Sequence, residues 1–177
     1  MIVVLMGVSG SGKTTIGTLL AERAGVVFAD GDDFHSEANK AKMHAGHPLT
    51  DEDREPWLET LNKLMRGWWE AGTGGVIACS ALKASYRAVL RAEMPPGTVT
   101  FVLLDASKAL IEERLETRHH AFMNPGLLDS QIATLEQPHG GSIEVENDRA
   151  PAEVVDEILR RVEALRGLGL KAAAERI

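Results

Sequence analysis

The chain has 177 residues, of which 44% are hydrophobic, so it can bury one good core and we expect a single domain over residues 1–177. A net charge of −7 leaves no basic stripe for a nucleic-acid backbone, which argues against DNA or RNA as a ligand. The single cysteine fits a reducing compartment, and no apolar run reaches the about 18 residues of a membrane span, so we expect a cytoplasmic protein without membrane contact.

The first element in the chain is an apolar strand, residues 2–6, which is followed by Gly7-Val8-Ser9-Gly10-Ser11-Gly12-Lys13-Thr14. This is the pattern G-x-x-x-x-G-K-[ST] between a strand and a helix. The glycines let successive backbone N–H groups face phosphate oxygens, and the helix that starts near Thr14 adds its positive end. The sequence therefore predicts a nucleotide site. Its expected residues are Gly7, Ser9, Gly10, Ser11, Gly12, Lys13, Thr14 and Thr15.

Within this site Lys13 is expected to reach the β and γ phosphates of ATP, and the Thr14 hydroxyl to bind Mg²⁺. The motif by itself leaves open whether the protein is a kinase, another NTPase or a switch. Guanine-specific switches usually carry N-K-x-D, and neither Asn39-Lys40-Ala41-Lys42 nor Asn62-Lys63-Leu64-Met65 supplies the final aspartate. The switch interpretation is therefore the weaker one.

Four further apolar runs follow, and helical segments separate them. The first helix ends at Gly25, and the last begins at Pro151. The runs are residues 26–29, which we expect to be a buried strand, 76–79, 99–104 and 143–145. Strands that alternate with helices and are apolar on both faces indicate a parallel sheet covered on two sides. The expected fold is α/β, in three layers (α/β/α), with a mostly parallel five-stranded sheet.

Polar side chains follow the strands, at the sheet edge where ligands bind in such folds. Asp30 and Asp32 come directly after the second strand; one can help to hold a metal ion and the other can orient an attacking hydroxyl. Arg54 suits bidentate binding of a carboxylate, or else pairs with Asp51 or Asp53 at the surface. After the third strand come more donors. They are Ser80, Lys83, Tyr86 and Arg87, which suggest a polyhydroxylated or anionic substrate.

Several of these stretches occur in a fixed order between residue 7 and about residue 138. They are Asp30-Gly31-Asp32 with His35, Asn39, Lys42 and Met43; Gly46 to Pro48-Leu49; Asp51 with Asp53-Arg54 and Pro56-Trp57-Leu58; and Cys79-Ser80-Ala81-Leu82-Lys83 with Tyr86-Arg87. Together they resemble the gluconokinases, small kinases of the phosphate-loop superfamily. The resemblance implies transfer of the ATP γ-phosphoryl group to the 6-hydroxyl of D-gluconate.

The resemblance also implies roles for individual residues. Asp30 would help to hold Mg²⁺, and Asp32 would orient or deprotonate the acceptor hydroxyl. The expected sugar-acid contacts are His35, Arg54, Lys83 and Arg87. A mobile helical lid is expected at about residues 119–137, flanked by Arg114 and Arg118, which would meet the nucleotide when the lid closes.

Three finer questions stay open. The lid of the family usually reads R-x-x-H-F-M, whereas this chain has Ala121 at the histidine position, with His120 one residue away. An alternative acceptor within the same chemistry is a small polar molecule such as shikimate. Trp68 and Trp69, adjacent on a helix, fit either core packing or a homodimer contact.

Overall fold

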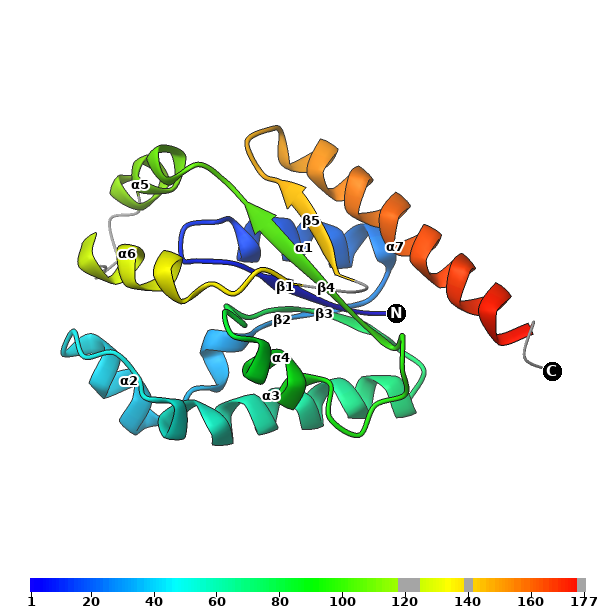
Figure 1. The fold of residues 1–177 in the computed structure, drawn as a ribbon, viewed down its shortest axis with the longest axis horizontal. Coiled ribbons are helices and arrows are strands. Elements are labelled where there is room, and N and C mark those ends of the chain that lie inside the picture. The colour runs from blue at the N-terminus through cyan, green and yellow to red at the C-terminus, as the bar shows by residue number, and fades with distance from the viewer. Residues whose placement is uncertain (118–124, 139–141, 175–177) are drawn as a thin grey trace.

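The computed structural model describes residues 1–117, 125–138 and 142–174. At its centre lies a five-stranded sheet with strand order β2-β3-β1-β4-β5 (Figure 1). Neighbouring strands run parallel at every pairing, which confirms the predicted three-layer α/β fold. The strands are β1 (Ile2–Met6), β2 (Val27–Asp30), β3 (Gly75–Ala78), β4 (Val99–Asp105) and β5 (Ile143–Glu146).

Helices cover both faces of the sheet, and others gather at the carboxyl ends of its strands (Figure 1). One face carries α1 (Lys13–Ala24) and α7 (Pro151–Ala174), and the other carries α3 (Asp51–Glu70) and α4 (Ala84–Leu90). Near the carboxyl ends lie η1, a short 3-10 helix (Gly31–Phe34), and α2 (Glu37–His44), α5 (Lys108–Glu116) and α6 (Pro125–Thr134). In the part of the chain described, no helix is long and apolar enough to cross a bilayer.

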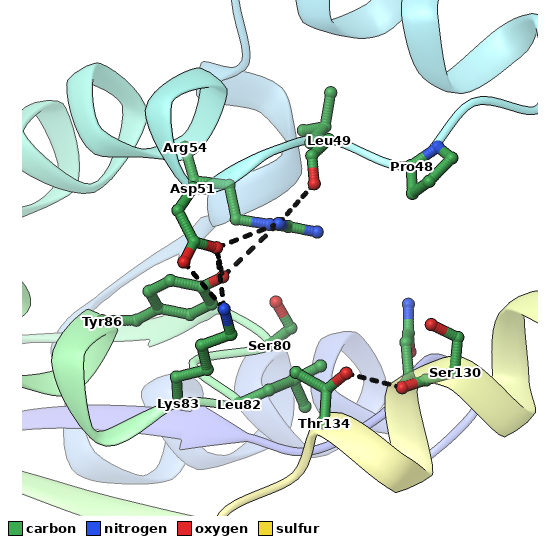
Figure 2. A pocket seen from close by; sticks show the side chains of 11 residues that line it. Pro48, Leu49, Asp51, Arg54, Ser80, Leu82, Lys83, Tyr86, Ser130 and Thr134 are labelled. Carbon is green, nitrogen blue, oxygen red and sulfur yellow. Dashed lines mark hydrogen bonds and ion pairs between the residues drawn. The ribbon is translucent and has the colours of Figure 1, made fainter.

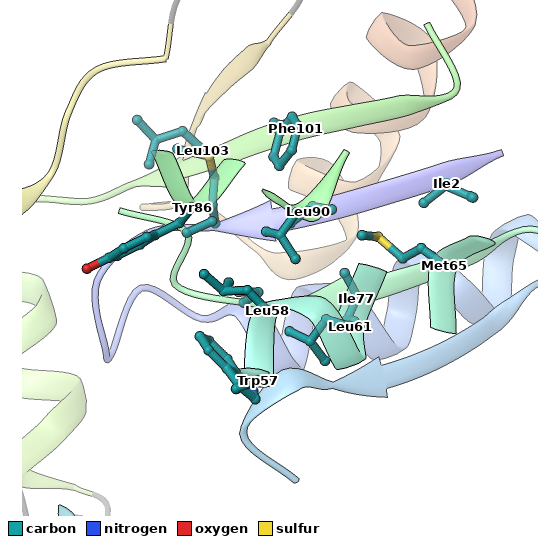
Figure 3. Close-up of a cluster of buried hydrophobic side chains, with 14 residues drawn as sticks. Ile2, Trp57, Leu58, Leu61, Met65, Ile77, Tyr86, Leu90, Phe101 and Leu103 are labelled. Atoms are coloured by element: carbon teal, nitrogen blue, oxygen red, sulfur yellow. The ribbon is translucent and has the colours of Figure 1, made fainter. Parts of the chain in front are cut away.

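The core follows from the alternation of side chains along β1. Ile2, Val4 and Met6 point to the face under α3 and α4, whereas Val3 and Leu5 point to the face under α1 and α7. Figure 3 shows the first of these two clusters, in which Leu58, Leu61 and Met65 of α3 pack on the strands. Because β1 is buried on both sides, the phosphate loop that follows it starts from a rigid position.

One sequence-based expectation needs correction. The run 26–29 was expected to be buried, but β2 pairs only with β3 and forms an edge of the sheet, so Val27 is 46% exposed. The helix that contains Leu58, α3, begins at Asp51, where the Thr50 hydroxyl and the Asp53 carboxylate form a capping box that satisfies free amides of the first turn.

The two adjacent tryptophans have different surroundings. Trp68 packs against the core beneath α3, whereas Trp69 is 45% exposed. Cys79 is buried within the same core, and its burial raises the pKa of the thiol to about 12, as expected of a small apolar side chain rather than a nucleophile. The homodimer stays a prediction.

Candidate active site

The phosphate loop (residues 7–14) leaves β1 and enters α1 at the carboxyl edge of the sheet. Lys13 Nζ donates to the carbonyl oxygens of Gly7 (3.0 Å) and Val8 (2.9 Å), so the ammonium lies across the loop. Gly12 caps α1 with a φ of +94°, which favours glycine strongly. Within the loop the N–H of Ser11 donates to Val8 O at 3.2 Å, and Thr15 is exposed in the first turn of α1.

Two residues from distant elements support this loop from below. Asn147, directly after β5, is 3% exposed and donates from Nδ2 to Ser11 O at 2.6 Å. Its own carbonyl oxygen accepts from Arg114 Nη2 at 2.6 Å. A Cβ at Gly12 would lie only 2.5 Å from Asn147 Nδ2, so the Asn147 amide occupies the space that any side chain at position 12 would need.

The same network contains two buried polar atoms that have no hydrogen-bond partner among the described residues. They are Arg114 Nη1 and Ser11 Oγ. Arg114 Nη1 lies 3.9 Å from the position that a Cβ of Gly12 would take, so this donor stands beside the phosphate loop. A buried donor without a partner is costly unless a ligand satisfies it. This position suits the nucleotide contact predicted for Arg114.

The acidic pair lies next to the phosphate loop, as the sequence predicts. Thr14 Oγ1 donates to Asp30 Oδ2 at 2.8 Å, and the backbone N–H of Asp32 donates to Asp30 Oδ1 at 3.1 Å. The Asp32 side chain is 83% exposed, but the protein atoms that crowd its surroundings partly desolvate it. This desolvation, together with the charge of Asp30, raises the pKa of Asp32, and Lys13 opposes the rise. A carboxylate with a raised pKa is a better proton acceptor.

His35 lies behind Asp32 and not in the open part of the site. It is buried and stacks on Trp57, with ring centroids 4.1 Å apart, and its Nε2 is 3.9 Å from Asp32 Oδ1. Burial lowers the pKa of His35 to about 4, with smaller contributions from the charges of Arg54 and Lys40. The ring is therefore neutral at pH 7.

A polar cavity of about 240 Å³ opens between the start of α3, the segment after β3 and helix α6 (Figure 2). It is smaller than the roughly 300–1,000 Å³ of sites for drug-sized ligands, so it suits a small acceptor. Its lining residues come from three stretches of the chain. They are Pro48, Leu49, Asp51, Arg54, Ser80, Leu82, Lys83, Tyr86, Ser130, Gln131 and Thr134.

One wall of the polar cavity carries a group of charged side chains around Asp51 (Figure 2). Lys83 Nζ donates to both oxygens of the Asp51 carboxylate, at 2.9 and 2.7 Å, and the Tyr86 hydroxyl donates to Oδ1. Arg54 Nη1 lies 3.8 Å from the same carboxylate and donates to Leu49 O at 2.5 Å. The hydrogen bonds from Lys83 and Tyr86 lower the pKa of Asp51, and the bond to Asp51 raises the pKa of Lys83.

Arg87 lies below this wall and does not line the polar cavity. It is 7% exposed, and its Nη1 donates to the carbonyl oxygens of Ala81 (2.9 Å) and Leu82 (3.0 Å). Ala81 has a φ of +44°, a strained conformation for a residue other than glycine. From its position, Arg87 holds the segment that presents Lys83 and Tyr86.

Two hydrogen bonds join the polar cavity to the phosphate loop. The N–H of Gly7 donates to Ser80 O at 3.2 Å, and the N–H of Ser9 donates to Gln131 Oε1 at 2.8 Å. Ser80 and Gln131 both line the cavity. A phosphoryl group held by the loop would therefore border the space in which an acceptor would lie.

Three of the residues described above were not predicted from the sequence as part of the site. Asn147 stands immediately after a strand, so the rule that ligands bind at carboxyl ends could have found it. Gln131 and the role of Asp51 had no local signal, because both depend on partners far away in the chain. Arg118 and Ala121 lie outside the described residues, and the mobile lid stays a prediction.

A phosphate loop that contacts an Asp-x-Asp pair, on a five-stranded parallel sheet of this strand order, defines a phosphate-loop kinase, a fold that binds ATP. A family model described as an AAA domain matches residues 2–138. The chain is 45% identical to a probable gluconokinase of Dictyostelium discoideum, over 89% of this chain and 84% of that protein. It is also 45% identical to a gluconokinase of Gluconobacter oxydans, over 91% and 90% of the two chains.

Solved structures give the same result. The crystal structure of a gluconokinase from Sinorhizobium meliloti 1021 matches with a TM-score of 0.85 and 40% identity, over 96% of both chains. The chain belongs to the gluconokinase family, and this confirms the resemblance seen in the sequence.

Proposed function

We propose that this protein phosphorylates D-gluconate at its 6-hydroxyl, with ATP as donor, to give 6-phosphogluconate and ADP. The observation that carries the proposal is the polar cavity, which borders the phosphate loop and carries a guanidinium and an ammonium, in a chain of the gluconokinase family. Within this cavity Arg54 is placed to bind the carboxylate of the acid. A planar guanidinium suits a carboxylate because it can donate two parallel hydrogen bonds.

The residues around the phosphate loop would then have separate roles in phosphoryl transfer. Asp32 accepts the proton of the 6-hydroxyl as that oxygen attacks the γ phosphorus, and its raised pKa suits this role. Lys13 lies across the loop, where it neutralises charge on the transferred group. Thr14 and Asp30 offer the oxygen ligands that Mg²⁺ prefers, and the ion would neutralise phosphate charge when bound.

The experiment that tests the proposal measures ADP release from Mg·ATP with D-gluconate, other sugar acids, shikimate or no acceptor. Turnover with gluconate well above the rate without acceptor is expected, together with 6-phosphogluconate as the product. The Asp32→Asn variant is the matched control, because it keeps the size of the side chain and removes the base. Faster turnover of shikimate than of gluconate would overturn the assignment.

A further inference from the structure

The polar cavity has a definite charge. Its lining contains two cations, Arg54 and Lys83, and one anion, Asp51. The remaining ionisable group among the described residues that line it is Tyr86, which is neutral at pH 7, because burial and the hydrogen bond to Asp51 raise the pKa of its hydroxyl. The described part of the lining therefore carries one net positive charge, which matches a monocarboxylate.

The two cations are not equivalent. Lys83 directs its ammonium at Asp51 through two hydrogen bonds, so it is committed to a partner within the protein. Arg54 makes its hydrogen bonds through Nη1 alone, to Leu49 O and, at 3.4 Å, to the Tyr86 hydroxyl. Within the described residues its other two guanidinium nitrogens make no hydrogen bond, and Figure 2 shows the free end pointing into the cavity.

We propose that Asp51 determines the acceptor specificity of this site as a positioning residue: it holds Lys83 and thereby leaves Arg54 as the cation of the described cavity lining that is available to the carboxylate of a monoanionic acid. The inference rests on the proposed function and deepens it. A neutral sugar would leave the Arg54 guanidinium without its counter-charge. A second negative charge close to the carboxylate of the acceptor would meet the charge of Asp51, which adds a repulsive element against dianions.

A charge cycle on the purified protein tests this role. Lys83→Met removes the cation that pairs with Asp51 and leaves it only the hydrogen bond from Tyr86. Asp51, already 3.8 Å from Arg54 Nη1, then pairs with that guanidinium and competes with the substrate. We expect the KM for gluconate to rise about tenfold or more, while the KM for ATP stays the same. Asp51→Asn combined with Lys83→Met removes both charges and leaves Arg54 free again. The double variant is expected to recover a KM within about threefold of the parent protein.

The outcomes separate the possibilities. A double variant as impaired as Lys83→Met would overturn the inference, because Lys83 or Asp51 would then contact the acceptor directly. An unchanged KM in Lys83→Met would overturn it as well. Lys42→Met is the matched control. It breaks the pair between Lys42 of α2 and Asp53, which lies in the same turn of α3 as Asp51, with 2.5 Å between Lys42 Nζ and Asp53 Oδ2. Neither residue lines the cavity, so the KM for gluconate should stay unchanged.

Failure of this inference is distinct from failure of the proposed function. If the parent protein does not phosphorylate gluconate, both fall. If it does and the double variant shows no recovery, only the role of Asp51 falls. Thermal unfolding of each variant identifies any that fails to fold, and in that case Lys83→Gln and Asp51→Asn/Lys83→Gln repeat the cycle with polar replacements.

Discussion

The two halves of the site are built in different ways. The donor half consists of the phosphate loop and the acidic pair, and backbone groups dominate it. Its phosphate loop follows β1, which is buried along its whole length, and Asn147 supports that loop, whereas the acidic pair lies at the end of the edge strand β2. The acceptor half is the polar cavity, which is formed by side chains from α3, from the segment that leads into α4 and from α6.

The difference indicates how each half should respond to change. The donor half depends on backbone conformation, so substitutions there act through geometry and affect nucleotide binding. The acceptor half depends on partly exposed charged side chains, whose removal leaves the fold largely intact and affects the KM of the acid. The five predictions below test this contrast, from the largest expected effect to the smallest.

Asp32→Asn tests the point where the two halves meet. Removing the proton acceptor is expected to lower kcat by roughly 10² to 10⁴-fold, because the 6-hydroxyl then attacks without a base. In the parent protein, activity should fall as the pH drops through the raised pKa of Asp32, because only the carboxylate accepts a proton. Steady-state kinetics against pH and calorimetric titration of ATP check both parts. Unchanged turnover with normal ATP binding would remove Asp32 from the mechanism.

Gly12→Ala tests the donor half. The new Cβ would meet Asn147 Nδ2 at 2.5 Å, at a φ of +94° that alanine adopts poorly. We expect ATP affinity to fall by about 10²-fold or more, a cost of about 3 kcal/mol. Gly25→Ala is the matched control, since it also has a positive φ, +65°, but nothing within 4 Å of its added Cβ. If both variants bind ATP equally well, the contact with Asn147 is unimportant.

His35 connects the two halves, because it faces Asp32 and is influenced by Arg54. Its pKa is about 4 in the folded protein, below the value of 6.5 that an unperturbed histidine has. The unfolded state therefore binds more protons between these values, and the free energy of unfolding should fall by roughly 3 kcal/mol as the pH drops from 7 to 4.

Denaturant unfolding of the parent protein and of His35→Asn at several pH values measures this effect. The asparagine variant lacks the titrating ring, so its stability should change less over the same pH range. Parallel curves for the two proteins would show that His35 does not cause the loss.

Arg54→Ala tests the acceptor half. Loss of the carboxylate partner is expected to raise the KM for gluconate by at least about tenfold and to leave the KM for ATP within about twofold. Arg54→Lys keeps the charge but loses the planar fork, so it should recover only part of the effect. Equal changes in both KM values would indicate a structural role, through the hydrogen bond to Leu49 O.

Gln131→Ala has the smallest expected effect, and it tests the boundary between the halves. In the free protein Gln131 Oε1 accepts from the N–H of Ser9, where a phosphate oxygen would bind. Removing this competitor should raise the affinity for a non-hydrolysable ATP analogue by about threefold. Ser130→Ala, one residue away on α6, should leave it unchanged. A weaker affinity in Gln131→Ala would show that the amide helps to bind the nucleotide.

The sequence alone was sufficient for the elements that contiguous residues encode. The phosphate loop is specified by glycines in a fixed spacing, and five apolar runs marked the five strands, although only pairing showed that β2 is an edge. The Asp-x-Asp pair was placed correctly beside the loop because carboxyl ends of parallel strands share one edge of a sheet.

Only the tertiary structure decided how the acceptor half is arranged. Lys83 reaches Asp51 across 32 residues, and Gln131 reaches Ser9 across 122 residues, so no local pattern could report either contact. Arg87 donates to two carbonyl groups close to it in the chain, those of Ala81 and Leu82, but its burial outside the cavity lining follows from tertiary packing. Backbone motifs are encoded where they occur in the chain, whereas the partners of long charged side chains depend on which segments the fold brings together.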